Sequence, residues 1–207
     1  MTVQAIKAVV FDMDGVLCRY DLKQRLSVLS AWSGRSPQEI YEAIFASGFE
    51  ERAERGELSA EEYLEGFSER LGHGLTRTQW AEARRVAIEP NHSVLRMVAD
   101  LSDRYVTAML TNNGYLLKEL LGEVFPQAAV TFGDRAFFSA ELGARKPEPE
   151  VYRKLCRRLN LEPVKVAYID DDAHYVLSAR SVGLRAAHVA DPSLLAPTLA
   201  GLGLTWP

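Results

Sequence analysis

Three short apolar runs constrain the fold of this chain more than any other feature of its sequence. They are AIKAVVF at 5–11, YVTAML at 105–110 and VKVAYI at 164–169, and each lacks the polar–apolar alternation of a half-buried strand. Such runs are typical of parallel strands that are covered on both faces. Segments with helical periodicity separate the later runs, at 93–103, 115–125 and 147–160, and a shorter strand candidate follows at 185–190. Strands alternating with helices predict an α/β fold with a mostly parallel sheet.

The stretch 20–88 follows a different pattern. It holds no convincing strand, and apolar residues in IYEAIF, EYLEGF and QWAEARRVAI recur at helical spacing. Capping-box signatures, which mark helix starts, begin at Ser36, Ser59 and Thr76. We therefore expect an all-helical domain at 20–88, inserted after the first strand into a core formed by 1–19 and 89–207.

Composition and charge exclude several classes of protein. The 207 residues are 47% hydrophobic, enough for a core, and the net charge of −4 with no dense basic tract argues against nucleic-acid binding. No stretch approaches the roughly 20 apolar residues that span a bilayer, and no signal-peptide pattern opens the sequence. Cys18 and Cys156 show no paired spacing. A cytoplasmic protein with no membrane partner is expected, and its oligomeric state stays open.

Polar residues follow each of the three apolar runs. Since ligands bind outside the carboxyl ends of the strands in an open parallel sheet, we expect these side chains to meet. Lys146 precedes Pro147, which favours an extended lysine and fits a first helical turn, so its ammonium can point to the same place. The polar segments are Asp12–Asp14, Thr111–Asn113 and Asp170–Asp172.

A cation and an anion can both bind such a cluster. Crowded carboxylates repel unless a hard cation lies among them, and Mg²⁺ takes one or two carboxylates together with water and phosphate oxygens. Backbone amides near Thr111 and Asn112, with a lysine and a helix N-terminus, form a receptor for an anion. The combination predicts phosphoryl transfer.

The segments FDMDGVL, LTNN, RKPEPEVY and YIDDD, in this order and spacing, resemble the four motifs of the haloacid dehalogenase superfamily. The resemblance covers essentially the whole chain and extends to the C1 phosphatase-like branch, including bacterial sugar-phosphate phosphatases. It implies a doubly wound, Rossmann-like parallel sheet with an inserted helical cap.

The resemblance also implies roles for individual residues. Asp12 would be the nucleophile that forms an aspartyl-phosphate, and Asp14 the general acid and base. Thr111 and the Asn112 amide would hold phosphoryl oxygens, and Lys146 would offset their charge and tether Asp12. The Mg²⁺ ligands would be Asp12, the Asp14 carbonyl and Asp171, with Asp170 in an outer shell or acting through water.

Simpler structural interpretations suffice for other residues. Asp172 is expected to cap the following helix, and the pair Arg84–Arg85 to lie on a solvated helix face. Relatives often carry Ser or Thr at the Asp172 position and Asn at the Tyr175 position. The candidates for substrate selectivity, which are weaker, are Arg19, Tyr20 and Phe49.

The expected activity is Mg²⁺-dependent hydrolysis of a small phosphorylated metabolite, such as a sugar phosphate. A 2-haloacid dehalogenase uses the same aspartate on carbon, but such relatives generally lack an acid at the Asp14 position. A phosphomutase needs an acceptor other than water. A catalytically silent binding module of the same fold is disfavoured, because the motif residues are intact.

Overall fold

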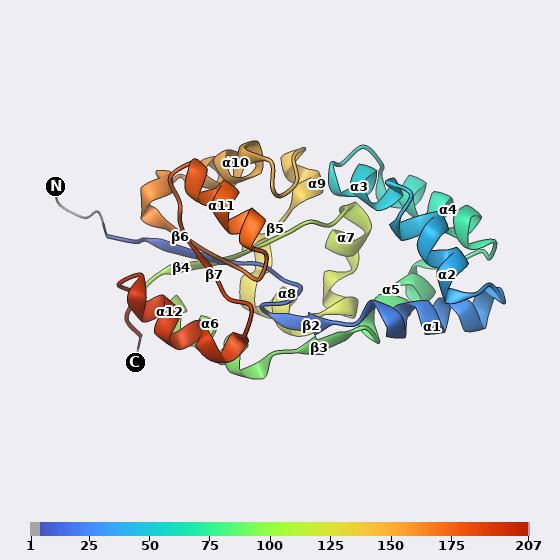
Figure 1. The fold of residues 1–207 in the computed structure, drawn as a ribbon, viewed down its shortest axis with the longest axis horizontal. Coiled ribbons are helices and arrows are strands. Elements are labelled where there is room, and N and C mark those ends of the chain that lie inside the picture. Colours follow the sequence, from blue (N-terminus) through green and yellow to red (C-terminus); the bar gives the residue numbers. More distant parts are fainter. Residues whose placement is uncertain (1–4, 207) are drawn as a thin grey trace.

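The computed structural model describes residues 5–206, and a five-stranded parallel sheet lies at its centre (Figure 1). The strand order is β5–β4–β1–β6–β7, so the strand formed by the first apolar run lies in the middle. The predicted α/β class and the three predicted strands are confirmed. Residues 1–4 and 207 of the predicted core lie outside the described residues. The strands are β1 (Ala8–Phe11), β4 (Val106–Thr111), β5 (Ala136–Phe138), β6 (Val166–Asp170) and β7 (Arg185–His188).

Helices cover both faces of the sheet, which makes the fold doubly wound (Figure 1). Successive strand residues point to opposite faces, so Ala8 and Val10 pack into one buried cluster while Val9 and Phe11 pack into another. The first face is covered by α10 (Pro149–Leu159) and α11 (Ala173–Ser181), and the second by α6 (His92–Ser102), α7 (Tyr115–Val124), α8 (Pro126–Phe132) and α12 (Leu195–Gly201).

Short helical segments complete the core: α9 (Ser139–Leu142) follows β5, and 3₁₀ turns lie at η2 (Gly133–Arg135), η3 (Pro163–Lys165) and η4 (Pro192–Leu194). Within the described part of the chain, no helix has the length and apolarity needed to cross a membrane.

The inserted helices form a separate layer at one end of the sheet, to the right in Figure 1. The chain enters this helical cap through β2 (Cys18–Tyr20) and leaves it through β3 (Ile88–Pro90), and these two short strands pair antiparallel. The capping boxes expected at Ser36, Ser59 and Thr76 are all formed. The cap elements are α1 (Leu22–Ser33), α2 (Pro37–Ile40), the π-helix η1 (Tyr41–Phe45), α3 (Phe49–Glu54), α4 (Ala60–Leu71) and α5 (Arg77–Arg85).

The sheet core predicts a large difference between two leucine-to-alanine variants. Leu110 in β4 is fully buried, whereas Leu177 in α11 is 61% exposed. We expect Leu110→Ala to lower the free energy of unfolding by about 2–5 kcal/mol, because it leaves a cavity in a packed core. Leu177→Ala should change it by less than about 0.5 kcal/mol. Urea unfolding followed by circular dichroism measures both values, and similar values for the two variants would contradict this description of the core.

Candidate active site

The carboxyl ends of β4, β1 and β6 meet at one edge of the sheet because the three strands run parallel and in register. Phe11 lies opposite Met109 on one side and Ile169 on the other, and the Asp12 N–H donates to the Ile169 carbonyl at 2.9 Å. A cavity of about 240 Å³ opens at this edge. It is lined by residues of all three polar segments together with Lys146 and Tyr175: Asp12, Asp14, Thr111, Asn112, Lys146, Asp171, Asp172 and Tyr175.

A buried lysine lies between two carboxylates at the floor of this cavity. The Lys146 ammonium is 2.6 Å from Asp12 Oδ1 and 2.9 Å from Asp170 Oδ2. Lys146 is 1% exposed, Asp12 6% and Asp170 not at all. Buried charges are costly unless they are paired, so this arrangement holds the Asp12 carboxylate in one position at the cavity.

Asp170 uses both of its oxygens inside the protein. Oδ2 accepts from the Lys146 ammonium and from the Tyr168 hydroxyl, and Oδ1 accepts from the Asp172 N–H at 2.8 Å. The Asp171 side chain is exposed and lines the cavity. Of the two, Asp171 therefore has the freer oxygens for a ligand.

The charges at the cavity floor do not balance. Burial raises the pKa of Asp12 to about 8; Lys146 lowers it and Asp170 raises it further. Burial would lower the pKa of Lys146, but Asp12 and Asp170 together raise it above its ordinary value. The pKa of Asp171 is also raised, first because its carboxyl group at the cavity is partly desolvated and then by Asp170. One ammonium does not offset three carboxylates, so the cluster favours an additional cation.

The loop after β4 positions Lys146. The Asn112 side chain donates to the Lys146 carbonyl at 2.9 Å and accepts from the Lys146 N–H at 2.8 Å. The prediction that Pro147 lies in the first turn of the next helix is wrong: α10 begins at Pro149, with Glu148 at the N-cap position. The asparagine clamp, rather than a helix that starts at Pro147, holds the lysine backbone.

Thr111 and its neighbours form the opposite wall. Thr111 is 2% exposed, and its hydroxyl accepts from Asn113 Nδ2 at 2.7 Å. The Asn113 N–H donates to Ser139 Oγ at 3.1 Å, which ties this loop to α9. The Thr111 hydroxyl can still donate its own proton to an anion in the cavity.

Gly15 brings the first and third polar segments together. Its φ is +92°, a conformation that other residues rarely adopt, and a Cβ at this position would lie 2.1 Å from Asp171 Oδ2. The absence of a side chain at Gly15 therefore allows Asp171 to approach the loop that carries Asp12 and Asp14.

The expectation that Arg84 lies on a solvated helix face is wrong. Its side chain is 5% exposed, and Nη2 donates to Asp14 Oδ2 at 2.6 Å. Only its neighbour Arg85 is exposed. An Arg–Arg pair in a helix carries no sign of this contact, because Arg84 and Asp14 are 70 positions apart in the sequence. By contrast, Asp172 caps α11 as predicted, with its side chain accepting from the His174 N–H.

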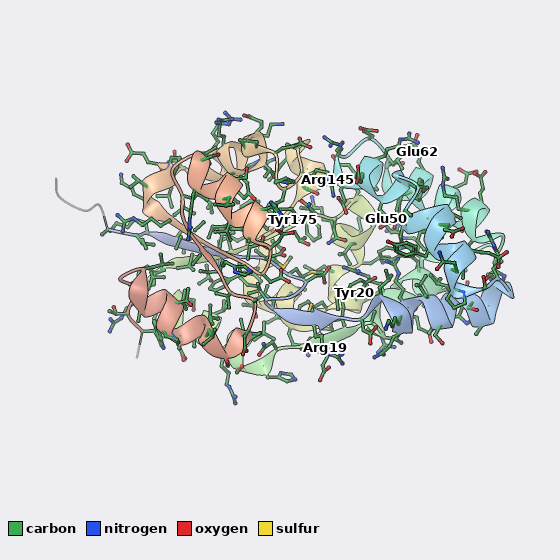
Figure 2. The ribbon with its side chains drawn as sticks, viewed as in Figure 1. Arg19, Tyr20, Glu50, Glu62, Arg145 and Tyr175 are labelled. Atoms are coloured by element: carbon green, nitrogen blue, oxygen red, sulfur yellow. The ribbon has the colours of Figure 1, made fainter. Side chains whose placement is uncertain are left out.

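Residues outside the predicted set join the cap to the core. Arg145, at the boundary between the two layers in Figure 2, pairs with Glu54 of α3 at 2.6 Å. Burial raises the pKa of Glu54 to about 7, although Arg145 lowers it. Tyr175 lines the cavity, and its ring centre lies 4.8 Å from the Lys146 ammonium. In the sequence, the position of Arg145 next to Lys146 was the signal that could have identified it. The only signal for Tyr175 was its position shortly after the three aspartates.

The three selectivity candidates lie outside the 240 Å³ cavity, although Arg19 and Tyr20 line a neighbouring cavity of about 840 Å³ that also includes Asp14 and Asp171. Arg19 is exposed and pairs with Glu89 across the β2–β3 strands at 2.6 Å (Figure 2). The Tyr20 ring lies 3.9 Å from the Arg84 guanidinium. Phe49 is buried in the cap, stacked on Tyr63 with ring centres 5.3 Å apart. These three are outside the residues that line the 240 Å³ cavity, so their place in selectivity stays a prediction.

The carboxylates at the cavity fit a hard divalent cation. Asp12, Asp170 and Asp171 each offer a carboxylate oxygen, and these oxygens lie within 4.8 Å of one another. An all-oxygen donor set is what Mg²⁺ prefers, and the unbalanced negative charge favours it. The Asp14 carboxylate is outside this group and is held by Arg84 instead.

Comparison with protein families gives the class of this protein. The model of the haloacid dehalogenase-like hydrolases matches residues 6–183, so the chain belongs to this family and is a hydrolase. The chain is also similar to the D-ribitol-5-phosphate phosphatase of Bacteroides thetaiotaomicron, with 21% identity over 183 residues, which cover 86% of this chain and 89% of the relative.

Solved structures of the family share this fold. A predicted HAD-like hydrolase of Porphyromonas gingivalis superposes with a TM-score of 0.80 at 20% identity, covering 98% of this chain and 100% of the other. A HAD family enzyme of Bacteroides thetaiotaomicron in complex with magnesium and inorganic phosphate gives a TM-score of 0.76 at 21% identity, covering 89% and 94%.

The two neighbouring aspartates after β6 should respond differently to replacement. Asp171→Ala removes an oxygen from the carboxylate cluster and should weaken Mg²⁺ binding by about tenfold or more, measured by titration calorimetry. Asp172→Ala removes a helix cap and should instead cost about 0.5–2 kcal/mol of stability with Mg²⁺ affinity nearly unchanged. The opposite ranking of the two affinities would contradict this assignment.

Proposed function

We propose that the protein is a Mg²⁺-dependent phosphomonoesterase that hydrolyses a small phosphorylated metabolite through an aspartyl-phosphate. The observation that carries this proposal is the pairing of Asp12 with Lys146 beside Asp14 in one cavity. Asp12 is fixed for attack, and Asp14 is a second carboxylate on the same wall that can move protons.

In the first step, Asp12 Oδ attacks phosphorus while the bond from phosphorus to the leaving alcohol breaks. Asp14 protonates the departing oxygen, and Lys146 and the Thr111 hydroxyl stabilise the phosphoryl oxygens. In the second step, Asp14 takes a proton from water, which displaces Asp12 and releases phosphate. Mg²⁺ held by Asp12, Asp171 and the Asp14 carbonyl would offset the charge of the phosphate dianion, with Asp170 holding Lys146 in place.

A phosphorylated sugar or sugar alcohol is the substrate class that we favour. The cavity of about 240 Å³ has room for a phosphate and a short leaving group. The similarity to a D-ribitol-5-phosphate phosphatase supports the same class. We propose that the cap at 20–88 selects the leaving group, because the Arg145–Glu54 pair ties α3 of the cap to the residue next to Lys146.

Each rival of this function is disfavoured for a different reason. A dehalogenase releases halide, which needs no proton, so an acid beside the nucleophile has no use there. A phosphomutase requires a second phosphorylated acceptor, whereas water is always present. A silent binding module would have no need of the Asp12–Lys146 pair buried at the cavity floor.

A phosphate-release screen tests the proposal. The purified protein, with a panel of sugar, sugar-alcohol and carboxylic-acid phosphates, should release phosphate only when Mg²⁺ is present. Removal of bound metal with EDTA should abolish turnover, and added Mg²⁺ should restore it. Full activity in excess EDTA would refute the metal requirement, and chloride release from a 2-haloacid with no phosphate release would favour the dehalogenase.

Replacement of Asp14 should give a penalty that depends on the leaving group. General acid catalysis contributes about 10²–10⁴-fold, so Asp14→Asn should lower kcat by a factor in this range for an alkyl phosphate. The loss should be much smaller for a nitrophenyl phosphate, whose leaving group is stable as an anion. Asp12→Asn is the matched variant and should abolish turnover of both. Equal losses of kcat for the two substrates in Asp14→Asn would remove the proton-transfer role from Asp14.

A further inference from the structure

Arg84 reaches the active site from the cap rather than from the catalytic core. It lies in the last turn of α5, directly before β3 returns the chain to the sheet. Its Nη2 donates to Asp14 Oδ2 at 2.6 Å, and both side chains lie where the β2–β3 connection joins the two layers. A residue of the cap therefore contacts a residue that lines the catalytic cavity.

Helix stability does not account for this contact. A basic residue in the last turn of a helix interacts well with the helix dipole, but exposed Arg85 meets that need without burial. Arg84 is 5% exposed, and its Nε has no hydrogen-bond partner among the described residues. Burial of a guanidinium is unfavourable unless it is paired, so the pair with Asp14 determines where Arg84 lies.

The guanidinium is fixed from two directions. Its central carbon lies 3.9 Å from the ring centre of Tyr20, and Tyr20 belongs to β2, which follows the Asp14 loop. Stacking sets the plane of the guanidinium, and the ion pair sets its direction. Arg84 is thus a rigid support for the Asp14 carboxyl group.

The two oxygens of Asp14 have different surroundings. Oδ2 is engaged by Arg84, whereas Oδ1 has, among the described residues, only the Cys18 thiol as a partner, at 3.5 Å. A thiol is a weak donor, so Oδ1 can exchange it for a substrate oxygen or a water. We propose that Arg84 is a positioning residue that holds Asp14 by Oδ2 and so presents Oδ1 to the leaving group.

This assignment rests on the proposed function. It adds the residue that sets the position of the proton donor, Asp14. The Oδ1–H bond breaks as the proton passes to the departing alkoxide oxygen, and Oδ1 later accepts a proton from the attacking water. Arg84 keeps its own protons in both steps. Because Arg84 belongs to the cap, the position of the cap also sets the position of the proton donor.

A double-mutant cycle tests the role of Arg84. In Arg84→Met, kcat for an alkyl phosphate should fall by about 10–100-fold, part of the full contribution of general acid catalysis, while KM changes by less than about threefold. The loss should be within about threefold for a nitrophenyl phosphate. Arg84→Lys, which keeps a charged donor, should recover part of the alkyl activity, and Arg85→Met is the matched control with kcat unchanged.

The decisive comparison uses Asp14→Asn as background. If Arg84 acts through Asp14, Arg84→Met should lower kcat by less than about twofold further in that variant, because the acid is already missing. Multiplicative losses in the double variant, or equal losses on alkyl and aryl phosphates, would overturn the positioning role. Arg84→Gln enters the same cycle if the Met variant unfolds, as judged from its thermal midpoint.

The result also separates this inference from the proposed function. Wild-type protein that releases no phosphate from any substrate would overturn the function and the role of Arg84 with it. An active wild type, with a leaving-group-dependent penalty in Asp14→Asn and multiplicative losses in the cycle, would overturn the role of Arg84 alone.

Discussion

The interaction on which the rest of this structure depends is the buried contact of Lys146 with two carboxylates. Its ammonium lies between Asp12 and Asp170, and all three side chains are nearly excluded from solvent. Such a group is stable only if its members are held in place, and the surrounding structure does this. Asn112 clamps the lysine backbone, while Tyr168 and the Asp172 N–H bind Asp170. The Asp12 carboxylate, which we propose as the nucleophile, is thereby fixed before any substrate arrives.

The carboxylates at the cavity floor carry more negative charge than Lys146 alone offsets. With burial raising the pKa of Asp12 to about 8, the cavity floor favours a cation as a companion to Lys146. Under the function that we propose, a cation bound there would make the same cavity a receptor for a phosphate dianion. Gly15 makes this possible, since any side chain at its position would collide with Asp171. The clustered carboxylates repel one another and would repel a phosphate dianion. A bound cation would offset both repulsions.

Two side-chain contacts join the cap to the segments that carry the site residues. Arg145 pairs with Glu54 across the boundary, and Arg84 reaches through the β2–β3 connection to Asp14. Neither contact follows from local sequence, because each joins residues far apart in the chain. Arg84 and Arg85 look alike as a pair in a helix, and only the packing of α5 against the Asp14 loop buries one of them.

Local sequence alone determined β1, β4, β6 and β7, the capping boxes and the order of the polar segments, but not β5. Burial on both faces requires uninterrupted apolar runs, and helix starts need side chains that satisfy free N–H groups, so these features are written in neighbouring residues. The sequence also predicted which carboxylates would meet, since parallel strands end at one edge of a sheet. Only the tertiary structure decided the β2–β3 pair, the start of α10 at Pro149, the clamp on Lys146 and the burial of Arg84. Those features arise from contacts between distant segments, where register and packing, rather than local propensity, set the geometry.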